Sequence, residues 1–267
     1  MKKILPMTML LAAFGAHGQE LDYAQLIPNV AAFKATNYSL AYNNLFDSSI
    51  PGVFEKGPSA FPVYSPKWQN GTFVSTLSGL GYNFSRDPRI QFGLRMTIEG
   101  ARDEYLKRDN YLTPRARNGN DASTLLESGA YLNYYINPNY ALLSSIKYGT
   151  GIDRNGVFVS VGGQATTKFA TNHRFTARFS ANWANGSYLQ SYFGVNSLQT
   201  GASNFGPFAP SSSLTDIKIG ASWQWNIDTN WSLTTGASYK HLFGDANNSL
   251  NFQKSPVTIY SSASFRF

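Results

Sequence analysis

The sequence predicts an all-β fold: a single-chain antiparallel transmembrane β-barrel of about 12 strands, with 10 or 14 strands also open. Segments of about 10–14 residues alternate apolar and polar side chains, as strands with two different faces do. Aromatic residues make up 15% of the chain and charged residues only 14%, which suits an outer face in lipid. An apparent export signal precedes these segments, and no later stretch resembles a transmembrane helix. A closed barrel is then the remaining way to satisfy the backbone in lipid.

The first residues resemble a signal peptide. Lys2 and Lys3 precede an apolar run over residues 4–16, and Ala16 and Gly18 form a small-x-small cleavage site. The apolar run is shorter than the roughly 20 residues that a transmembrane helix needs. We therefore expect cleavage after Gly18 and export to the outer membrane of a Gram-negative bacterium. Residues 1–18 would be the signal peptide, 19–33 a periplasmic segment and 34–267 the barrel.

The strands are expected from repeated alternation with period two. In residues 216–227, Ile217 and Ile219 share an apolar face, while Asp216 and Lys218 share a polar one. The twelve expected strands are 34–44, 59–69, 72–85, 89–102, 125–136, 139–149, 156–168, 173–184, 187–197, 213–227, 231–243 and 256–267.

An even number of strands places both termini of a barrel on the periplasmic side. With the expected strands, however, the long connection 103–124 also lies on that side. The tight turns at 85–88 and 137–139 lie outside. Because periplasmic turns are normally the short ones, this arrangement implies a miscounted segment or an unusual topology.

Three features favour a membrane barrel over a soluble sandwich. The expected strands are about 10–14 residues long, which suits a tilted span of the membrane. Charged residues occur in the middle of the polar faces, which indicates a wet interior. Aromatic residues gather near strand ends, as in the girdles at the two membrane interfaces. These residues are Tyr140, Tyr148, Trp183, Trp225, Trp231, Tyr239 and Phe243.

The second half of the chain resembles the MipA/OmpV family of outer-membrane proteins, the MltA-interacting proteins. The segments that carry the resemblance are Ser191–Val195, Leu214–Ile217, Asn230–Leu233, Leu242–Ala246 with Ser249, and Ser264–Phe267, with weaker similarity at Gly71–Phe73 and Leu80–Asn83. One departure is Leu250, where the family pattern has proline.

The resemblance implies an outer-membrane barrel and a scaffolding role between a lytic transglycosylase and a peptidoglycan synthase. Other members are described as porin-like or adhesive. In barrels of this kind the C-terminal aromatic residues, here Phe265 and Phe267, resemble the signal read by the barrel-insertion machinery.

Catalysis, cofactors and nucleic-acid binding are not expected. Serine hydrolases need a base beside the nucleophile, usually histidine. After the leader only His173, in an expected turn, and His241, on an outward face, remain. No cysteine and no histidine cluster indicates a metal site. The cations are scattered singly, unlike a nucleic-acid-binding patch.

The interior of the barrel is the candidate site. The polar faces are expected to carry eight cations and three anions into it: Arg89, Arg95, Glu99, Glu127, Lys147, Arg174, Arg178, Asp216, Lys218, Lys240 and Arg266. Such charges make an anion-leaning pore if they are hydrated. They plug the lumen if they pair across it. The leading hypothesis is a non-enzymatic scaffold with a role in envelope maintenance, and the alternative is a passive, anion-leaning diffusion channel.

Overall fold

The computed structural model describes residues 38–47, 56–64, 71–75, 79–99, 125–150, 156–193, 209–248 and 254–266. The described residues form one antiparallel sheet with two short helices. The strands are β1 (Tyr38–Asp47), β2 (Lys56–Tyr64), β3 (Thr72–Ser75), β4 (Gly79–Asn83), β5 (Ile90–Glu99), β6 (Leu125–Tyr135), β7 (Tyr140–Thr150), β8 (Gly156–Ala170), β9 (His173–Ala184), β10 (Ser213–Asn226), β11 (Trp231–Leu242) and β12 (Val257–Arg266). The helices are α2 (Gly186–Phe193) and α4 (Gly244–Asn248).

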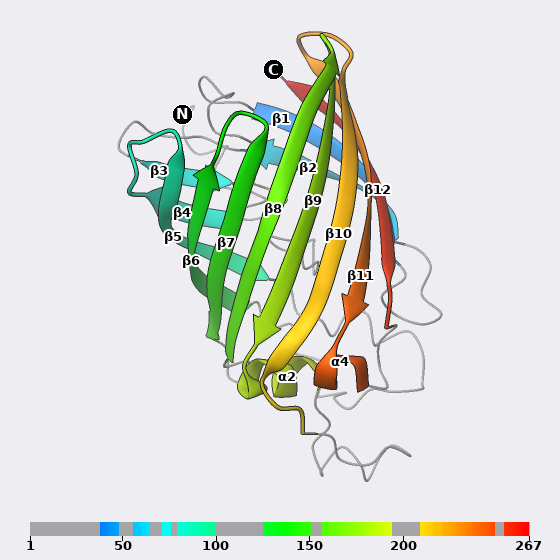
Figure 1. The fold of residues 1–267 in the computed structure, drawn as a ribbon. Helices are drawn as coiled ribbons and strands as arrows, with labels where there is room; N and C mark the ends of the chain where they lie inside the picture. Colours follow the sequence, from blue (N-terminus) through cyan, green and yellow to red (C-terminus); the bar gives the residue numbers. More distant parts are fainter. Residues whose placement is uncertain are drawn as a thin grey trace, which may run out of the picture.

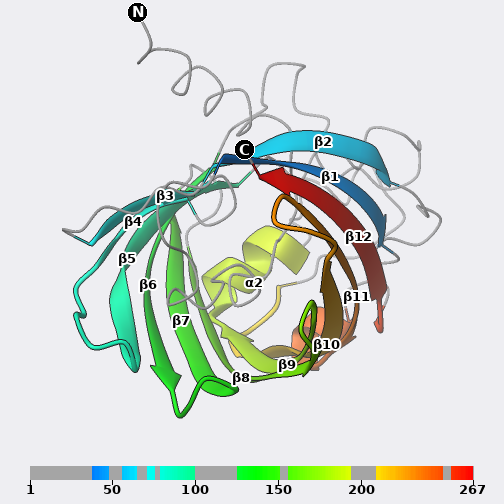
Figure 2. The same cartoon turned by 90° about the horizontal axis from the view of Figure 1, so that it is seen from above.

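The sheet is twelve-stranded and curls into a barrel. Its strand order is β2-β1-β12-β11-β10-β9-β8-β7-β6-β5-β4-β3, so every strand from β3 to β12 pairs with its neighbour in sequence. β12 returns to pair with β1, with Ser39 opposite Arg266. Seen from above, the strands surround a central space, and β2 and β3 are the two ends of the sheet (Figure 2). The seam of the barrel therefore lies between β2 and β3, and not between β1 and β12.

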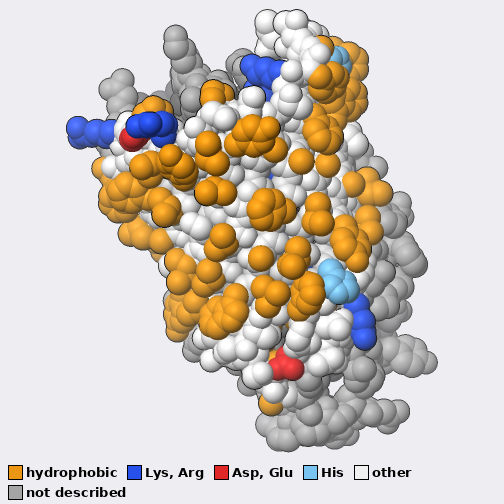
Figure 3. Space-filling view, in the orientation of Figure 1, with side chains coloured by type: hydrophobic (Ala, Val, Ile, Leu, Met, Phe, Trp, Pro, Cys, Tyr) orange, Lys and Arg blue, Asp and Glu red, His pale blue; other side chains and the backbone are white. Residues whose placement is uncertain are grey.

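Alternation in the sequence corresponds to alternation between the inside and the outside of the barrel. On β5, Gln91 and Arg95 are buried, whereas Phe92, Leu94 and Met96 are exposed. Soluble proteins bury apolar side chains and expose polar ones, and this barrel does the opposite. Along β6 to β10 the exposed side chains again include many large apolar ones. On the outer face seen in Figure 3, hydrophobic side chains cover the middle, and the Lys and Arg side chains lie toward its two ends. An outer surface with so many exposed apolar side chains is suited to contact with lipid rather than with water.

Two expected strands are wrong. Residues 187–197 were expected as a strand, but the structure has α2 at Gly186–Phe193. The physical reason is Asn185, which caps the helix: its Oδ1 accepts hydrogen bonds from the Tyr188 amide at 3.0 Å and from the Val157 amide at 2.9 Å. The Leu189 amide donates to the Asn185 carbonyl as the first helical bond.

The expected strand 72–85 is in fact a pair of antiparallel strands, β3 and β4. Gly79, where β4 begins, has a φ of 77°, a left-handed conformation that glycine adopts without steric cost. The two errors cancel, so the count of twelve is retained while the topology changes.

The corrected topology resolves the conflict over connection lengths. The tight turns β4–β5, β6–β7, β8–β9 and β10–β11 now lie at the end where β1 begins and β12 ends. The connections that contain residues 100–124, α2 and α4 lie at the other end, as Figure 1 shows for the two helices. We call these the turn end and the helix end. Short turns and termini mark the periplasmic side of a barrel, so the turn end is the one expected to face the periplasm.

Side-chain carboxylates and amides stabilise three of the four tight turns. Asp87 Oδ1 accepts from the Arg89 amide at 2.8 Å, and Asn137 Oδ1 accepts from the Tyr140 amide at 2.9 Å. Asp228 Oδ1 accepts from the Trp231 amide at 2.7 Å. These Asx turns explain why Asp and Asn occupy the turn positions.

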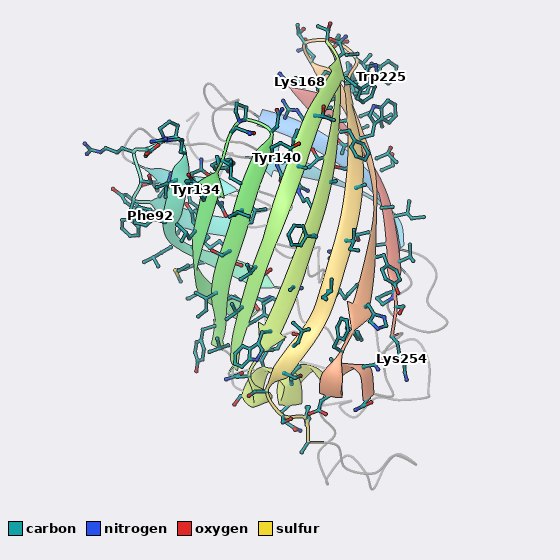
Figure 4. The ribbon with its side chains drawn as sticks, viewed as in Figure 1. Phe92, Tyr134, Tyr140, Lys168, Trp225 and Lys254 are labelled. Atoms are coloured by element: carbon teal, nitrogen blue, oxygen red, sulfur yellow. The ribbon has the colours of Figure 1, made fainter. Side chains whose placement is uncertain are left out.

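Aromatic residues cluster on the outer surface near the turn end. Phe92, Tyr134 and Tyr140 lie there on β5 to β7, and Trp225 lies at the extended tip of β10 (Figure 4). Phe92, Tyr134 and Tyr140 are all exposed. They correspond to the aromatic girdle expected at one membrane interface.

Candidate functional site: the lumenal charges

The predicted inward charges fall into two groups that lie on opposite parts of the curled sheet. One group is on β5 to β7, and the other is on β9 to β11 (Figure 2). The groups also differ in burial. Arg95, Glu127 and Lys147 in the first are buried, whereas Arg178 and Lys218 in the second are half-exposed.

In the first group an ion pair forms inside the barrel. Lys147 Nζ on β7 lies 3.3 Å from Glu127 Oε1 on β6, and both side chains are almost fully buried. Arg95 on β5 and Lys147 both stand opposite Gly129, so Glu127 is diagonal to each of them. A Cβ at Gly129 would lie 2.6 Å from the Ile146 carbonyl oxygen, so a larger residue between the two cations would require the β7 backbone to shift. One anion thus stands between two cations.

Helix α2 packs against this charged group. Lys147 Nζ lies 4.9 Å from the centre of the Phe158 ring and 5.8 Å from that of Tyr188 on α2. Cation–π attraction of this kind is favourable where water is excluded. Aromatic residues of β8 and α2 therefore complete the surroundings of the buried ion pair, a feature that the strand interpretation of residues 187–197 missed.

A small apolar core holds α2 at the helix end. Leu189 is fully buried and Tyr188 is nearly so, and they cluster with Ala184, Leu242 and Ala246 of α4. In the view down the barrel, α2 lies across the interior of the ring of strands (Figure 2). Figure 1 places α2 at the helix end of the strands, so the helix projects over the mouth of the barrel there and restricts it.

The second group forms a continuous wall on β9 to β11. Lys218 on β10 stands directly opposite Lys240 on β11, and Arg178 on β9 stands opposite Gly220. Arg178 Nε donates to Gln164 Oε1 at 2.8 Å. Arg174 lies on the same face of β9, four residues before Arg178 and closer to the turn end. All four cations are half-exposed.

Asp216 is the acidic member of this wall. It is buried, and its Oδ1 accepts a hydrogen bond of 2.6 Å from Asn182 Nδ2. It precedes Lys218 by two residues and therefore shares its face. The pairing with Asn182 ties β10 to β9 at the helix end.

Several expected site residues lie elsewhere or outside the description. Arg89 is not inside the barrel: it ends the β4–β5 turn, its side chain is 73% exposed, and it lies 3.7 Å from Asp87. The reason is that β5 begins one residue later, at Ile90. Glu99, Phe265 and Arg266 lie in strands, but their side chains are outside the described set, and Phe267 is outside it altogether.

The two histidines are on the outer face. His173 was expected in a turn, but it begins β9 and stacks on Phe169, Trp223 and Trp225. Trp223 Nε1 donates to its Nδ1 at 3.2 Å. His241 lies between Tyr239 and Phe243 on the outward face of β11, where the sequence predicts it. Within the described residues, His, Cys, Asp and Glu nowhere form a group of three that could hold a metal ion.

The fold and the lumenal charges define a class, the outer-membrane β-barrels. One solved structure of that class, described as a bacterial polysaccharide outer membrane secretin, is similar at a TM-score of 0.50 and 8% identity, covering 88% of this chain and 100% of its own. The KdgM porin in complex with disordered oligogalacturonate (0.48, 10%, 86% and 99%) and the NanC porin (0.48, 11%, 87% and 100%) are also similar.

The chain belongs to the family described as MltA-interacting protein MipA, whose sequence profile matches residues 45–267. Comparison with curated protein sequences finds no match. Among the described residues no helix is long and apolar enough to cross a membrane.

Proposed function

We propose that this protein is a non-enzymatic scaffold of the outer membrane, exported with a signal peptide cleaved after Gly18, whose barrel is restricted by α2 and does not serve as an open pore. Its partners on the periplasmic side are a lytic transglycosylase and a peptidoglycan synthase. The observation that carries the proposal is the packing of α2 across the helix end of the barrel, with Leu189 fully buried. Membership of a family described as MltA-interacting supports the choice of partner.

Burial of the Lys147–Glu127 pair also supports a restricted lumen. A freely hydrated channel would leave such side chains exposed to water, whereas here they are 6% and 4% exposed. Taking a charge pair out of water is costly, so the surroundings that bury it must be packed firmly. A wide aqueous path beside β6 and β7 is therefore disfavoured.

Site-specific photocrosslinking tests the scaffold. A photoreactive phenylalanine analogue would replace Thr229, which is exposed at the turn end. A matched position is Asn248, which is exposed on α4 at the helix end. The proposal expects an adduct with a lytic transglycosylase from position 229 and none from 248. Adducts from neither position, or only from 248, would contradict it.

A passive diffusion channel with anion preference is the second candidate. The observation that favours it is the half-exposed row of cations on β9 to β11. Cations on a pore wall select for anions. Single-channel conductance of the purified protein in planar bilayers distinguishes the two candidates, because a scaffold with α2 in place passes little current.

A further inference from the structure

The β4–β5 turn carries two arginines at the edge of the lipid-facing surface. Arg86 and Arg89 are both exposed. Lys and Arg side chains project beyond the hydrophobic surface on this side of the turn end (Figure 3). The other three described tight turns differ, because residues 136–139 and 171–172 include no charged residue and residues 227–230 include one acid, Asp228. A pair of arginines is therefore specific to the β4–β5 turn among the tight turns that the structure describes.

A stack of aromatic rings on the outer face leads directly to Arg86. Tyr82, Phe84 and Arg86 are all exposed, and the residues between them are half-buried, so the three share the outer face. The Phe84 amide donates to the Phe92 carbonyl at 2.9 Å. The Phe84 ring lies 5.0 Å from that of Tyr82 and 5.9 Å from that of Phe92, between centroids. Because Phe92 belongs to the aromatic girdle, Arg86 lies just outside the girdle.

This position corresponds to the depth of lipid phosphates. Arg86 is two residues beyond Phe84, which is at most about 7 Å along the chain. Aromatic girdles lie at the headgroup level. The headgroups add roughly 5–8 Å to each side of the hydrocarbon core. An arginine one step outside the girdle therefore reaches phosphate oxygens while its charge stays out of the hydrocarbon.

Hydrogen bonds within the turn fix where the two arginines leave the backbone. The Asp87 amide donates to Ser85 Oγ at 3.1 Å, and the Arg89 amide donates to Asp87 Oδ1 at 2.8 Å. The same carboxylate oxygen lies 3.7 Å from Arg89 Nε, in an exposed pair of the kind that contributes little to stability. Two arginines and one aspartate give the turn a net charge of +1, which complements one phosphate diester.

We propose that Arg86 and Arg89, together with the stacked rings of Tyr82, Phe84 and Phe92, form a binding site for an anionic phospholipid of the periplasmic leaflet. The guanidinium groups bind the oxygens of the phosphate diester through paired hydrogen bonds. The rings contact the glycerol and the upper part of the acyl chains. This phospholipid site goes beyond the proposed scaffold, and it does not depend on whether the lumen conducts.

Native mass spectrometry of the full-length protein in a neutral detergent tests the phospholipid site. The probes are dioleoylphosphatidylglycerol, dioleoylphosphatidylcholine and inorganic phosphate. Both lipids have the same acyl chains and a phosphate diester, but only the first has a net negative charge. We expect phosphatidylglycerol to be retained more tightly than phosphatidylcholine, and inorganic phosphate not to displace it. Equal retention of the two lipids, or displacement by inorganic phosphate, would overturn the proposal.

The variant Arg86→Gln/Arg89→Gln tests whether the two arginines hold the lipid. We expect the affinity for phosphatidylglycerol to fall about fivefold for each arginine removed, and retention of phosphatidylcholine to stay the same. The variant Arg86→Lys/Arg89→Lys keeps the charge without the paired hydrogen bonds, so its affinity should lie between the two. Both arginines are exposed in a turn, so heat-modifiability should show that each variant folds.

The matched control is Lys254→Gln, which removes an exposed cation at the helix end (Figure 4). We expect it to retain phosphatidylglycerol like the wild type. Wild-type affinity in the glutamine variant of the two arginines, or an equal loss in Lys254→Gln, would overturn the proposal.

Discussion

Ala221 and Ser222 are consecutive residues of β10 with opposite surroundings. Ala221 is exposed on the apolar outer face, and Ser222 is half-buried on the inner face. Arginine at Ala221 would place a charge in lipid and should lower the free energy of unfolding by roughly 2–4 kcal/mol if it lies near the midplane. Arginine at Ser222 should cost much less. Urea titration from liposomes measures both, and equal costs would show that the assigned faces are wrong.

The buried Glu127–Lys147 ion pair allows a test, with single substitutions, of whether this part of the lumen wall excludes water. Removing one partner leaves the other charge buried, so Lys147→Met or Glu127→Gln should each destabilise the protein by about 3–5 kcal/mol. The double variant should recover much of that loss, because no uncompensated charge remains. A double-mutant cycle of unfolding free energies measures the coupling. Additive single effects would contradict a direct buried interaction.

Most of the inward positions could be predicted from alternation, because a period of two fixes the face of every residue once a strand is recognised. Arg95, Glu127, Lys147 and Asp216 are inside for this reason. Alternation does not say where a strand begins, so Arg89 was placed inside and lies on a turn. It also does not distinguish a strand from a short helix, so the contact of Tyr188 with Lys147 was missed.

At the scale of elements, α4 is connected to the start of β10 through one carboxylate. Asp245 Oδ2 accepts from the Ser211 amide at 2.6 Å and from its hydroxyl at 2.8 Å. These hydrogen bonds favour the charged form, so they lower the pKa of Asp245 below its ordinary value of 3.8. Because its pKa is lowered in the folded state, Asp245 stabilises that state at pH values above its ordinary pKa of 3.8. That stability is lost as the pH falls through the folded pKa.

An NMR titration of the Ser211 amide tests this connection. Its chemical shift should change with a midpoint below pH 3.8, and Ser211→Ala should move the titration of Asp245 back toward the ordinary value. The amide signals around Asp87, in an exposed turn at the other end, show whether the protein stays folded during the titration. A Ser211 midpoint at or above 3.8 would show that the hydrogen bonds do not form in solution.

The helix α2 shows why an element could be mispredicted while the fold was not. In its sequence, Gly186–Phe193, the aromatic residues Tyr188, Tyr192 and Phe193 do not alternate strictly, and the Asn185 cap also indicates a helix. In the expected strand 72–85 the apolar residues change phase between Leu77 and Leu80, and this change marks the reversal between β3 and β4. The placement of short turns at one end indicated a miscounted segment or an unusual topology, and the structure supplies the corrected topology.

At the scale of the whole molecule, β12 joins the end of the chain to its first strand. β12 pairs with β1 on one side and β11 on the other, with Phe265 opposite Leu40 and Trp231. Because β12 connects β1 to β11, the assembly of the sheet depends on this strand, and deletion of the C-terminal aromatic residue Phe267 should impair assembly. The amount of heat-modifiable protein in outer membranes measures this, with Phe267→Tyr as the control that keeps an aromatic ring. Wild-type amounts after deletion would contradict the prediction.

The single-channel conductance of purified protein in planar bilayers tests the restricted lumen most directly, in the wild type and in Leu189→Asp. Leu189 is fully buried where α2 packs at the helix end, so an aspartate there should release the helix. The account predicts little current through the wild type, and a larger current with anion preference through the variant. A large, steady wild-type current that Leu189→Asp leaves unchanged would contradict it.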